Sequence, residues 1–302
     1  ANIKNELGKT TYTQMLNDDG GIEADVTVVC LDKEHFRIIS SATLRERDKH
    51  HILKNLDSEI GFKDVTEDYA CLGLFGPKSR SLITEIFGDY FKNENFPFAT
   101  AKSISTQGIK VWAQRLSYVG ELGWELYVPT SNAKKIYNII VSIGKKYKLC
   151  HAGVHAMDIL RMEKGYLHWG HDISPEENQY EAGLNFAISY KKNVDFIGKN
   201  VLLKKKDAKP KKKLIVLSLK KSKPGFPLLL HDEPIYFNGK IIGRTTSANY
   251  SFNYKKSIAF GYVETQQDLK KYKIEIEVEK EKYEALVEDR PIHDPNNKIL
   301  KS

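Results

Sequence analysis

The chain has 302 residues, of which 41% are hydrophobic and 28% charged, and its formal net charge is +8. This composition is ordinary for a soluble, folded protein, and the length suffices for two or three domains. No apolar run approaches the ~20 residues of a membrane-spanning helix, and no secretory signal pattern opens the chain. We therefore expect a cytoplasmic protein that has no membrane partner.

The three cysteines, Cys30, Cys71 and Cys150, lie far apart in the sequence. This spacing fits neither a disulfide framework nor a zinc ribbon, so we expect three reduced, buried thiols. Positive charge gathers in the lysine-rich segment 204–213, in which Asp207 is the only residue of opposite charge. Such a run is typical of a solvated linker, here a domain boundary, although a weak attraction for anionic ligands stays open. No nucleic-acid-binding motif accompanies it, so we expect no nucleic-acid partner.

The N-terminal region reads as an antiparallel meander. Strand-like segments at Tyr12–Leu16 and Ile22–Cys30 flank the pair Gly20-Gly21, which suits a hairpin turn. A third strand is predicted at His35–Ile39, and a helix at Ala42–Leu56.

Residues 60–148 read as a compact unit of mixed strands and helices. The order of these elements favours a ferredoxin-like arrangement. The predicted strands are 69–75, 109–116 and 125–128, and the predicted helices follow Gly76-Pro77 and cover 133–147. A further helix is predicted at Gly153–Met162. Beyond the lysine-rich segment, short strands broken by Gly, Pro and Asn indicate a small antiparallel barrel or sandwich.

The segment Arg115–Tyr127 carries two carboxylates, three aromatic rings and two glycines within a strand-turn-strand pattern. Glu125 lies between Trp124 and Leu126, at a strand position where an acid is poorly suited. Glu125, with Tyr118 and Glu121, either forms the polar face of a sheet or recognises a flat heterocycle. A carboxylate can accept two parallel hydrogen bonds from an amidine-like N–H edge, and neighbouring rings supply stacking area.

Asp25 is the second candidate acid. In strict alternation Ile22, Ala24 and Val26 share one strand face, while Asp25 lies on the other face between Glu23 and Thr27. Asp25 therefore either faces water or stands at the mouth of a ligand cavity.

Other motifs point away from a metal or a nucleotide. His151 with His155, and His168 with His171, have spacings that could face a metal, but no acidic helix motif supports them, so we expect no metal. Asp158 and Arg161 are spaced as an ordinary helix-surface pair. The chain has no P-loop, no Gly-x-Gly-x-x-Gly and no nucleophile elbow, which argues against a nucleotide- or flavin-binding domain within it.

Taken together, several segments resemble the glycine-cleavage T-protein (aminomethyltransferase) family. Within that family their residues are most similar to the folate-binding C-terminal part of dimethylglycine and sarcosine dehydrogenases. The matching segments are 12–18, 20–25, 115–125, 160–170, 181–184, 196–199 and 243–247. They are spread along nearly the whole chain, and it is the set rather than any one segment that carries the resemblance.

The resemblance implies an α+β, multi-domain fold around a central tetrahydrofolate pocket. A first folate-binding domain would comprise 1–58 and 149–200, a ferredoxin-like domain 59–148, and a C-terminal antiparallel β-barrel 213–302. The family's first domain has about half a domain more before the segment that matches Ala1, so we expect the chain to begin inside it.

In activity, the resemblance implies a transferase of one-carbon metabolism. Tetrahydrofolate would accept a methylene unit from a small-molecule amine or methylene donor, giving 5,10-methylenetetrahydrofolate. A flavin dehydrogenase domain or subunit outside this chain would carry any FAD. Two alternatives stay open: a non-catalytic folate-binding or interaction module, and a tetrahydrofolate-dependent demethylase on the same fold.

The resemblance also assigns site residues. Asp25 resembles the family's catalytic acid beside the reactive folate nitrogens, and Glu125 the acid that holds the amino edge of the pterin. Tyr12, Tyr118 and Tyr166 resemble aromatic positions that line the pocket. Met157 departs from the pattern, because free-standing T-proteins usually carry arginine there; that folate contact is lost or supplied elsewhere.

Overall fold

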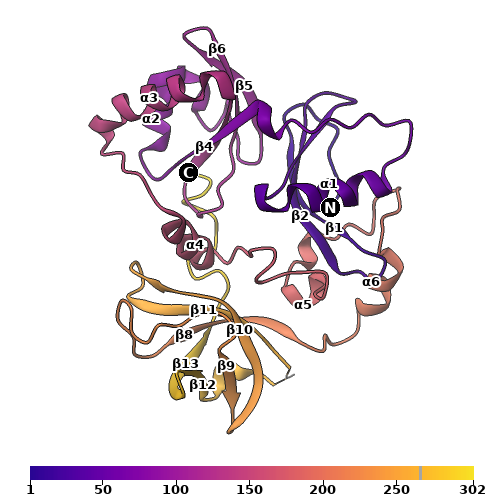
Figure 1. The fold of residues 1–302 in the computed structure, drawn as a ribbon, viewed down its shortest axis with the longest axis vertical. Coiled ribbons are helices and arrows are strands. Elements are labelled where there is room, and N and C mark those ends of the chain that lie inside the picture. Colours follow the sequence, from indigo (N-terminus) through magenta and orange to yellow (C-terminus); the bar gives the residue numbers. More distant parts are fainter. Residues whose placement is uncertain (265–266) are drawn as a thin grey trace. The chain divides into compact units, whose positions relative to one another are not determined.

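The computed structural model describes residues 1–264 and 267–302, which form mixed helices and strands (Figure 1). The chain divides into two compact units. The first comprises Ala1–Thr13, Asp25–Ala152 and Asn296–Ser302, and the second comprises Gln14–Ala24 and Gly153–Pro295. The three domain ranges expected from the sequence stay a prediction.

The predicted N-terminal meander is confirmed. Strands β1 (Thr10–Leu16), β2 (Ile22–Cys30) and β3 (Phe36–Ile39) form a sheet in the order β1-β2-β3. At the turn before β2, the Asn17 side-chain oxygen accepts the backbone N–H of Gly21 at 2.7 Å. The helix that follows begins as one 3₁₀ turn, Ala42–Leu44, and continues as α1 (Arg45–Asn55).

A four-stranded antiparallel sheet lies at the centre of the first unit. Its order is β4-β7-β6-β5, and helices α2 and α3 pack on one of its faces (Figure 1). The chain order is therefore strand, helix, three strands, helix, whereas a ferredoxin-like unit has its second helix before its last strand. The elements are β4 (Tyr69–Phe75), α2 (Ser79–Phe87), β5 (Ala101–Thr106), β6 (Ile109–Gln114), β7 (Gly123–Pro129) and α3 (Ala133–Gly144).

Strand β7 has one face in the core and one face away from it. Trp124, Leu126 and Val128 are fully buried in the core formed with the two helices. Glu125 and Tyr127 alternate with them and are only half-buried. Because side chains alternate along a strand, both lie on the sheet face opposite the helices, which we call the outer face.

The C-terminal part of the second unit is a closed six-stranded barrel, so of the two predicted alternatives the barrel is confirmed. Its strands follow the order β10-β11-β8-β13-β12-β9. They are β8 (Lys213–Leu219), β9 (Pro234–Phe237), β10 (Lys240–Ser251), β11 (Lys256–Val263), β12 (Ile274–Val278) and β13 (Glu281–Glu288). The sequence had not indicated β13, in which half of the residues are charged.

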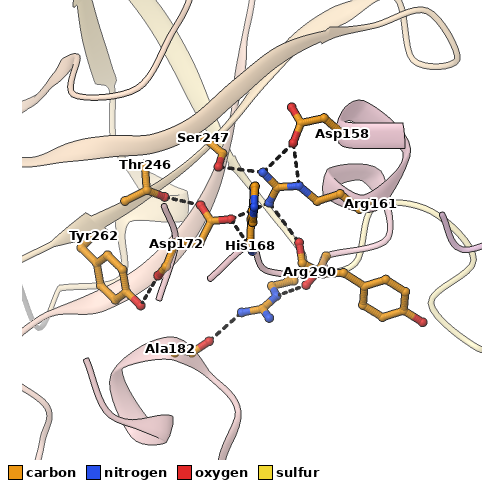
Figure 2. Close-up of polar contacts among 11 residues, drawn as sticks. Asp158, Arg161, His168, Asp172, Ala182, Thr246, Ser247, Tyr262 and Arg290 are labelled. Atoms are coloured by element: carbon orange, nitrogen blue, oxygen red, sulfur yellow. Dashed lines mark hydrogen bonds and ion pairs between the residues drawn. The ribbon is translucent and has the colours of Figure 1, made fainter. Parts of the chain in front are cut away.

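In the second unit, three α-helices precede the barrel: α4 (Val154–Glu163), α5 (Gln179–Ala182) and α6 (Lys199–Lys205). The lysine-rich segment thus begins as the last turn of α6 rather than as a linker throughout. The predicted surface pair of Asp158 and Arg161 needs correction, because the Arg161 side chain is only 1% exposed. Its guanidinium also pairs with the fully buried Asp172 and donates to Ser247 of β10 at 2.8 Å (Figure 2).

Two further findings concern the surface. Cys30 is buried, as predicted, but Cys71 and Cys150 are exposed, so the prediction of three buried thiols was wrong for two of them. Across residues 1–264 and 267–302, no helix combines the length and apolarity that crossing a bilayer requires.

Candidate functional site

The structure places the five predicted site residues on different elements. Tyr12 lies on β1, Asp25 on β2, Tyr118 in the β6–β7 loop and Glu125 on β7. These four belong to the first unit, whereas Tyr166, which follows α4, belongs to the second. The first unit therefore carries both candidate acids.

Glu125 lies in the middle of the outer face. Its neighbours across the sheet are Gly73 on β4 and Gln114 on β6. The hydroxyl of Tyr127 donates a hydrogen bond of 2.8 Å to Glu125 Oε2. Burial raises the pKa of the Glu125 carboxyl, and the Tyr127 hydrogen bond opposes that rise. The carboxylate is thus partly withdrawn from water and has one neutral donor near it.

An aromatic ring lies on the outer face, against the strand position across from Glu125, because two glycines make room for it. A Cβ added to Gly73 would lie 2.6 Å from the Phe75 ring, and one added to Gly123 would lie 2.3 Å from it. Both glycines share the outer face with Glu125, and Gly73 is exposed. The half-buried Phe75 ring therefore lies over the two glycines, and the sheet face stays open next to Glu125.

Arg37 covers the part of the outer face that carries Tyr69 and Trp112. The Arg37 guanidinium of β3 lies 4.7 Å from the centroid of the Tyr69 ring and 5.8 Å from that of the Trp112 ring. Tyr69 is on β4, and Trp112 of β6 lies across from Tyr127. Arg37 thus stacks on the face that carries Glu125, by cation–π contacts.

The alternation predicted for β2 is confirmed. Ile22, Ala24 and Val26 are buried, whereas Asp25 lies on the half-buried face between Glu23 and Thr27. The carboxylate of Asp25 is therefore neither in the core nor fully in water. Its catalytic role stays a prediction.

The predicted tyrosines have different surroundings. Tyr12 is 36% exposed, and Tyr118 is half-buried in a loop where Ser117 Oγ accepts the backbone N–H of Glu121 at 3.2 Å. Burial raises the pKa of Tyr166 to about 12, so this phenol stays protonated at neutral pH. Met157 has a side chain that is 41% exposed at the position where arginine was expected. The pocket-lining roles of the three tyrosines stay predictions.

Sequence reasoning missed Phe75, Tyr127 and Gln114 as neighbours of Glu125. A signal for Phe75 was present, since a glycine inside a strand often marks a close approach of another group. Tyr127 was within the segment singled out, two residues beyond Glu125, where strand geometry puts it on the same face. Gln114 carried no signal, because only the register of β6 with β7 places it there.

No metal site accompanies these groups. Within the part of the chain that the structure describes, no three His, Cys, Asp or Glu side chains are placed to hold a metal ion. His168 and His171 stack at 4.5 Å between ring centroids, and the outer-face acid Glu125 accepts its hydrogen bond from the Tyr127 hydroxyl. The site therefore has the chemistry of a carboxylate among aromatic rings.

Comparison with protein families adds the decisive observation. Residues 1–192 match the model of the GCVT N-terminal domain, and residues 212–294 match that of the glycine cleavage T-protein C-terminal barrel domain. The chain belongs to the glycine cleavage T-protein family. The resemblance inferred from the sequence segments is thereby confirmed, as is the α+β fold with a C-terminal barrel.

Relatives of this T-protein family member include both dehydrogenases and a transferase. It is 34% identical to human mitochondrial sarcosine dehydrogenase over 279 residues, which cover 87% of this chain and 30% of that protein. It is 34% identical to an aminomethyltransferase of Halothermothrix orenii over 259 residues, 85% of this chain and 70% of that protein. This chain therefore spans under a third of the sarcosine dehydrogenase that it matches.

A solved structure shares the fold of this T-protein family member. The crystal structure of the glycine cleavage system aminomethyltransferase T from Bartonella henselae matches with a TM-score of 0.82. The match covers 95% of this chain and 76% of that chain, at 21% sequence identity.

Proposed function

We propose that this chain transfers a one-carbon unit to tetrahydrofolate, as the folate module of an enzyme of the dimethylglycine or sarcosine dehydrogenase type. The donor would be a small-molecule amine, and any FAD would be held outside this chain. Support comes from membership of the T-protein family and from relatives that include sarcosine dehydrogenase and an aminomethyltransferase. The observation that carries the proposal is the half-buried carboxylate of Glu125 on the open part of the outer face.

The residues around Glu125 fit a reduced pterin ring. The pterin edge has adjacent N–H groups, which a carboxylate accepts as two parallel hydrogen bonds. Gly73 presents no side chain beside the carboxylate, and the Phe75 ring lies next to it as an apolar surface for a flat ring. Glu125 would therefore hold and orient the ring, while Phe75 would exclude water from one side of the contact.

Asp25 would serve the reaction itself. Bound tetrahydrofolate would supply the two nucleophilic nitrogens that accept the carbon unit. The Asp25 carboxylate, half-buried on β2, would orient the amine donor and stabilise the positive charge on it. It would also take up the proton that a folate nitrogen releases. Most of the rate enhancement would come from positioning, since the two reactants already differ in charge and reactivity.

The test separates binding from turnover. Glu125→Gln keeps the shape but loses the charge, so its affinity for tetrahydrofolate in calorimetry should fall about 10- to 100-fold. Asp25→Asn should bind folate nearly as the parent does, but form methylenetetrahydrofolate about 100-fold more slowly.

Three results would count against the proposal. Parent-like affinity in Glu125→Gln would refute the binding assignment, and parent-like turnover in Asp25→Asn would refute the catalytic one. Folate binding by the parent without any turnover, when the donor supplied is an iminium formed from the amine and formaldehyde and so already carries its carbon at the methylene level, would indicate a non-catalytic folate module.

A further inference from the structure

Gln114 is a buried amide without a partner. It is the last residue of β6, its side chain is 0% exposed, and neither its amide oxygen nor its amide nitrogen has a hydrogen-bond partner among the described residues. Native proteins contain few such groups, because an unpaired amide away from water destabilises the fold. A group of this kind therefore needs an explanation beyond packing.

Gln114 lies next to Glu125 on the outer face, where its amide could contact the same ligand. Gln114 lies directly across from Glu125 in the pairing of β6 with β7, and both side chains are on the outer face. Opposite side chains in antiparallel strands have Cβ atoms about 4.5–5.5 Å apart. Across this row of the sheet, Gly73 is exposed, Glu125 is half-buried and Gln114 is fully buried. A ring that lies beside the Phe75 ring and is held by Glu125 thus has its inner end toward Gln114.

We propose that Gln114 is a specificity-determining residue that recognises the 4-oxo oxygen of the pterin ring whose N–H edge Glu125 accepts. This inference rests on the proposed function. A 2-amino-4-oxo ring presents the sequence donor, donor, acceptor along one edge. The Glu125 carboxylate accepts from the two donors, and the Gln114 amide, which has two N–H donors, gives one to the ring oxygen. This contact satisfies the Gln114 amide, which has no hydrogen-bond partner among residues 1–264 and 267–302.

The ring contact also explains why an amide, and not an apolar side chain, occupies a fully buried place on β6. Ala113, its neighbour in sequence, is buried in the apolar core on the other face, so β6 is otherwise built for packing. A site that hydrogen-bonds a particular group on its ligand discriminates strongly against a ligand that lacks the group.

The experiment compares two ligands that differ at the 4-position of the ring. Folic acid carries the 4-oxo oxygen and an N3 hydrogen, whereas aminopterin carries an amino group at the 4-position and no N3 hydrogen. Because the change at N3 affects the parent and the Gln114 variants alike, the change in the affinity ratio between them reports on residue 114. Gln114→Met keeps the size of the side chain and removes its polar atoms, so affinity for folic acid should fall about three- to tenfold. Gln114→Glu keeps the shape but can only accept, so the ratio of folic acid to aminopterin affinity should shift toward aminopterin by about tenfold or more. Asn138→Met, an exposed amide on α3, is the control and should change neither affinity.

The thermal midpoint of the ligand-free protein distinguishes a ligand contact from a structural role. Gln114→Met should keep or raise the midpoint, because it removes an unpaired buried amide. A lowered midpoint with equal losses for both ligands would overturn the proposal, as would affinities within about twofold of the parent in both variants. If the Glu125 substitution lowers folate affinity but the Gln114 substitutions do not, only this inference fails. If the parent binds neither ring, the proposed function fails as well.

Discussion

At the scale of single residues, the ionisation of Glu125 decides what its carboxyl group can bind. Burial raises the pKa of this carboxyl, whereas the hydrogen bond from Tyr127 lowers it, and burial is the larger influence. Only the ionised form accepts two parallel N–H donors. Ligand binding to Glu125 is therefore linked to loss of a proton.

A pH profile tests this linkage. Because the pKa of Glu125 in the free protein is raised, folate affinity should be constant above that pKa. As the pH falls below it, affinity should decrease by up to about tenfold per pH unit for one linked proton. Calorimetry across this pH range measures the effect, and Glu125→Gln should remove this part of the dependence. An identical profile in the parent and in Glu125→Gln would contradict it.

Tyr127 should act on binding through Glu125. Removing its hydroxyl in Tyr127→Phe takes away the hydrogen bond that lowers the pKa of Glu125, so that pKa should rise further. The decline in folate affinity should then begin at a higher pH, while affinity at high pH should drop only about three- to tenfold. Tyr137→Phe, on the exposed surface of α3, provides the comparison. A Tyr127→Phe profile that overlays that of the parent would show that the hydroxyl does not set the pKa.

At the scale of elements, the central sheet of the first unit has two unlike faces. The inner face of β7 is apolar and packs on α2 and α3, which stabilises the sheet by burial of apolar surface. The outer face carries the Glu125 carboxylate, the Tyr127 phenol and the Gln114 amide in neighbouring positions. Glycines on β4 and β7 leave room on this face for the Phe75 ring. The helices thus stabilise the sheet on one side, and this leaves polar groups on the other available for a ligand.

Gly73→Ala tests the importance of the open place on β4. The added methyl group would lie 2.6 Å from the Phe75 ring, so the ring must leave its present position. Overpacking of this kind should destabilise the unit by about 1 kcal/mol and should lower folate affinity. Gly61→Ala, whose added Cβ would meet nothing within 4 Å, is the matched control. Unchanged folate affinity in Gly73→Ala would exclude a role for the position of Phe75 in binding.

At the scale of the whole chain, a buried ion-pair network connects α4 to the barrel. Helix α4 belongs to the N-terminal family domain, but it lies in the same compact unit as the barrel. Arg161 of α4 pairs with Asp158 and Asp172, and Asp172 accepts from Thr246 of β10 (Figure 2). Tyr262 of β11 donates to the Asp172 carbonyl oxygen at 2.9 Å. Residues before 192 and after 212, matched by two different family domains, are thereby fastened within one unit.

Asp172→Asn should weaken this connection. The substitution removes the negative charge that pairs with Arg161, a guanidinium that is 1% exposed. Loss of one partner of a buried pair should lower the free energy of unfolding by about 3 kcal/mol, which urea denaturation measures. Asp195→Asn, an exposed acid in the same unit, should lower it by less than about 1 kcal/mol. Equal effects of the two substitutions would show that the network does not stabilise the unit.

The sequence by itself determined the features that follow from local periodicity. The alternation of β2 predicted which of its side chains face away from the core, and it put Asp25 on the correct face. The T-protein resemblance was also readable from segments along the chain, and it implied the closed barrel.

Only the tertiary structure decided which distant residues surround Glu125 and how deeply each charge is buried. Gly73, Phe75 and Gln114 become its neighbours through strand register, and Arg161 leaves the surface because the barrel packs over α4. The strand order of the central sheet and the existence of β13 were decided there too. The reason is that pairing between strands far apart in the chain depends on contacts whose pattern no single segment contains.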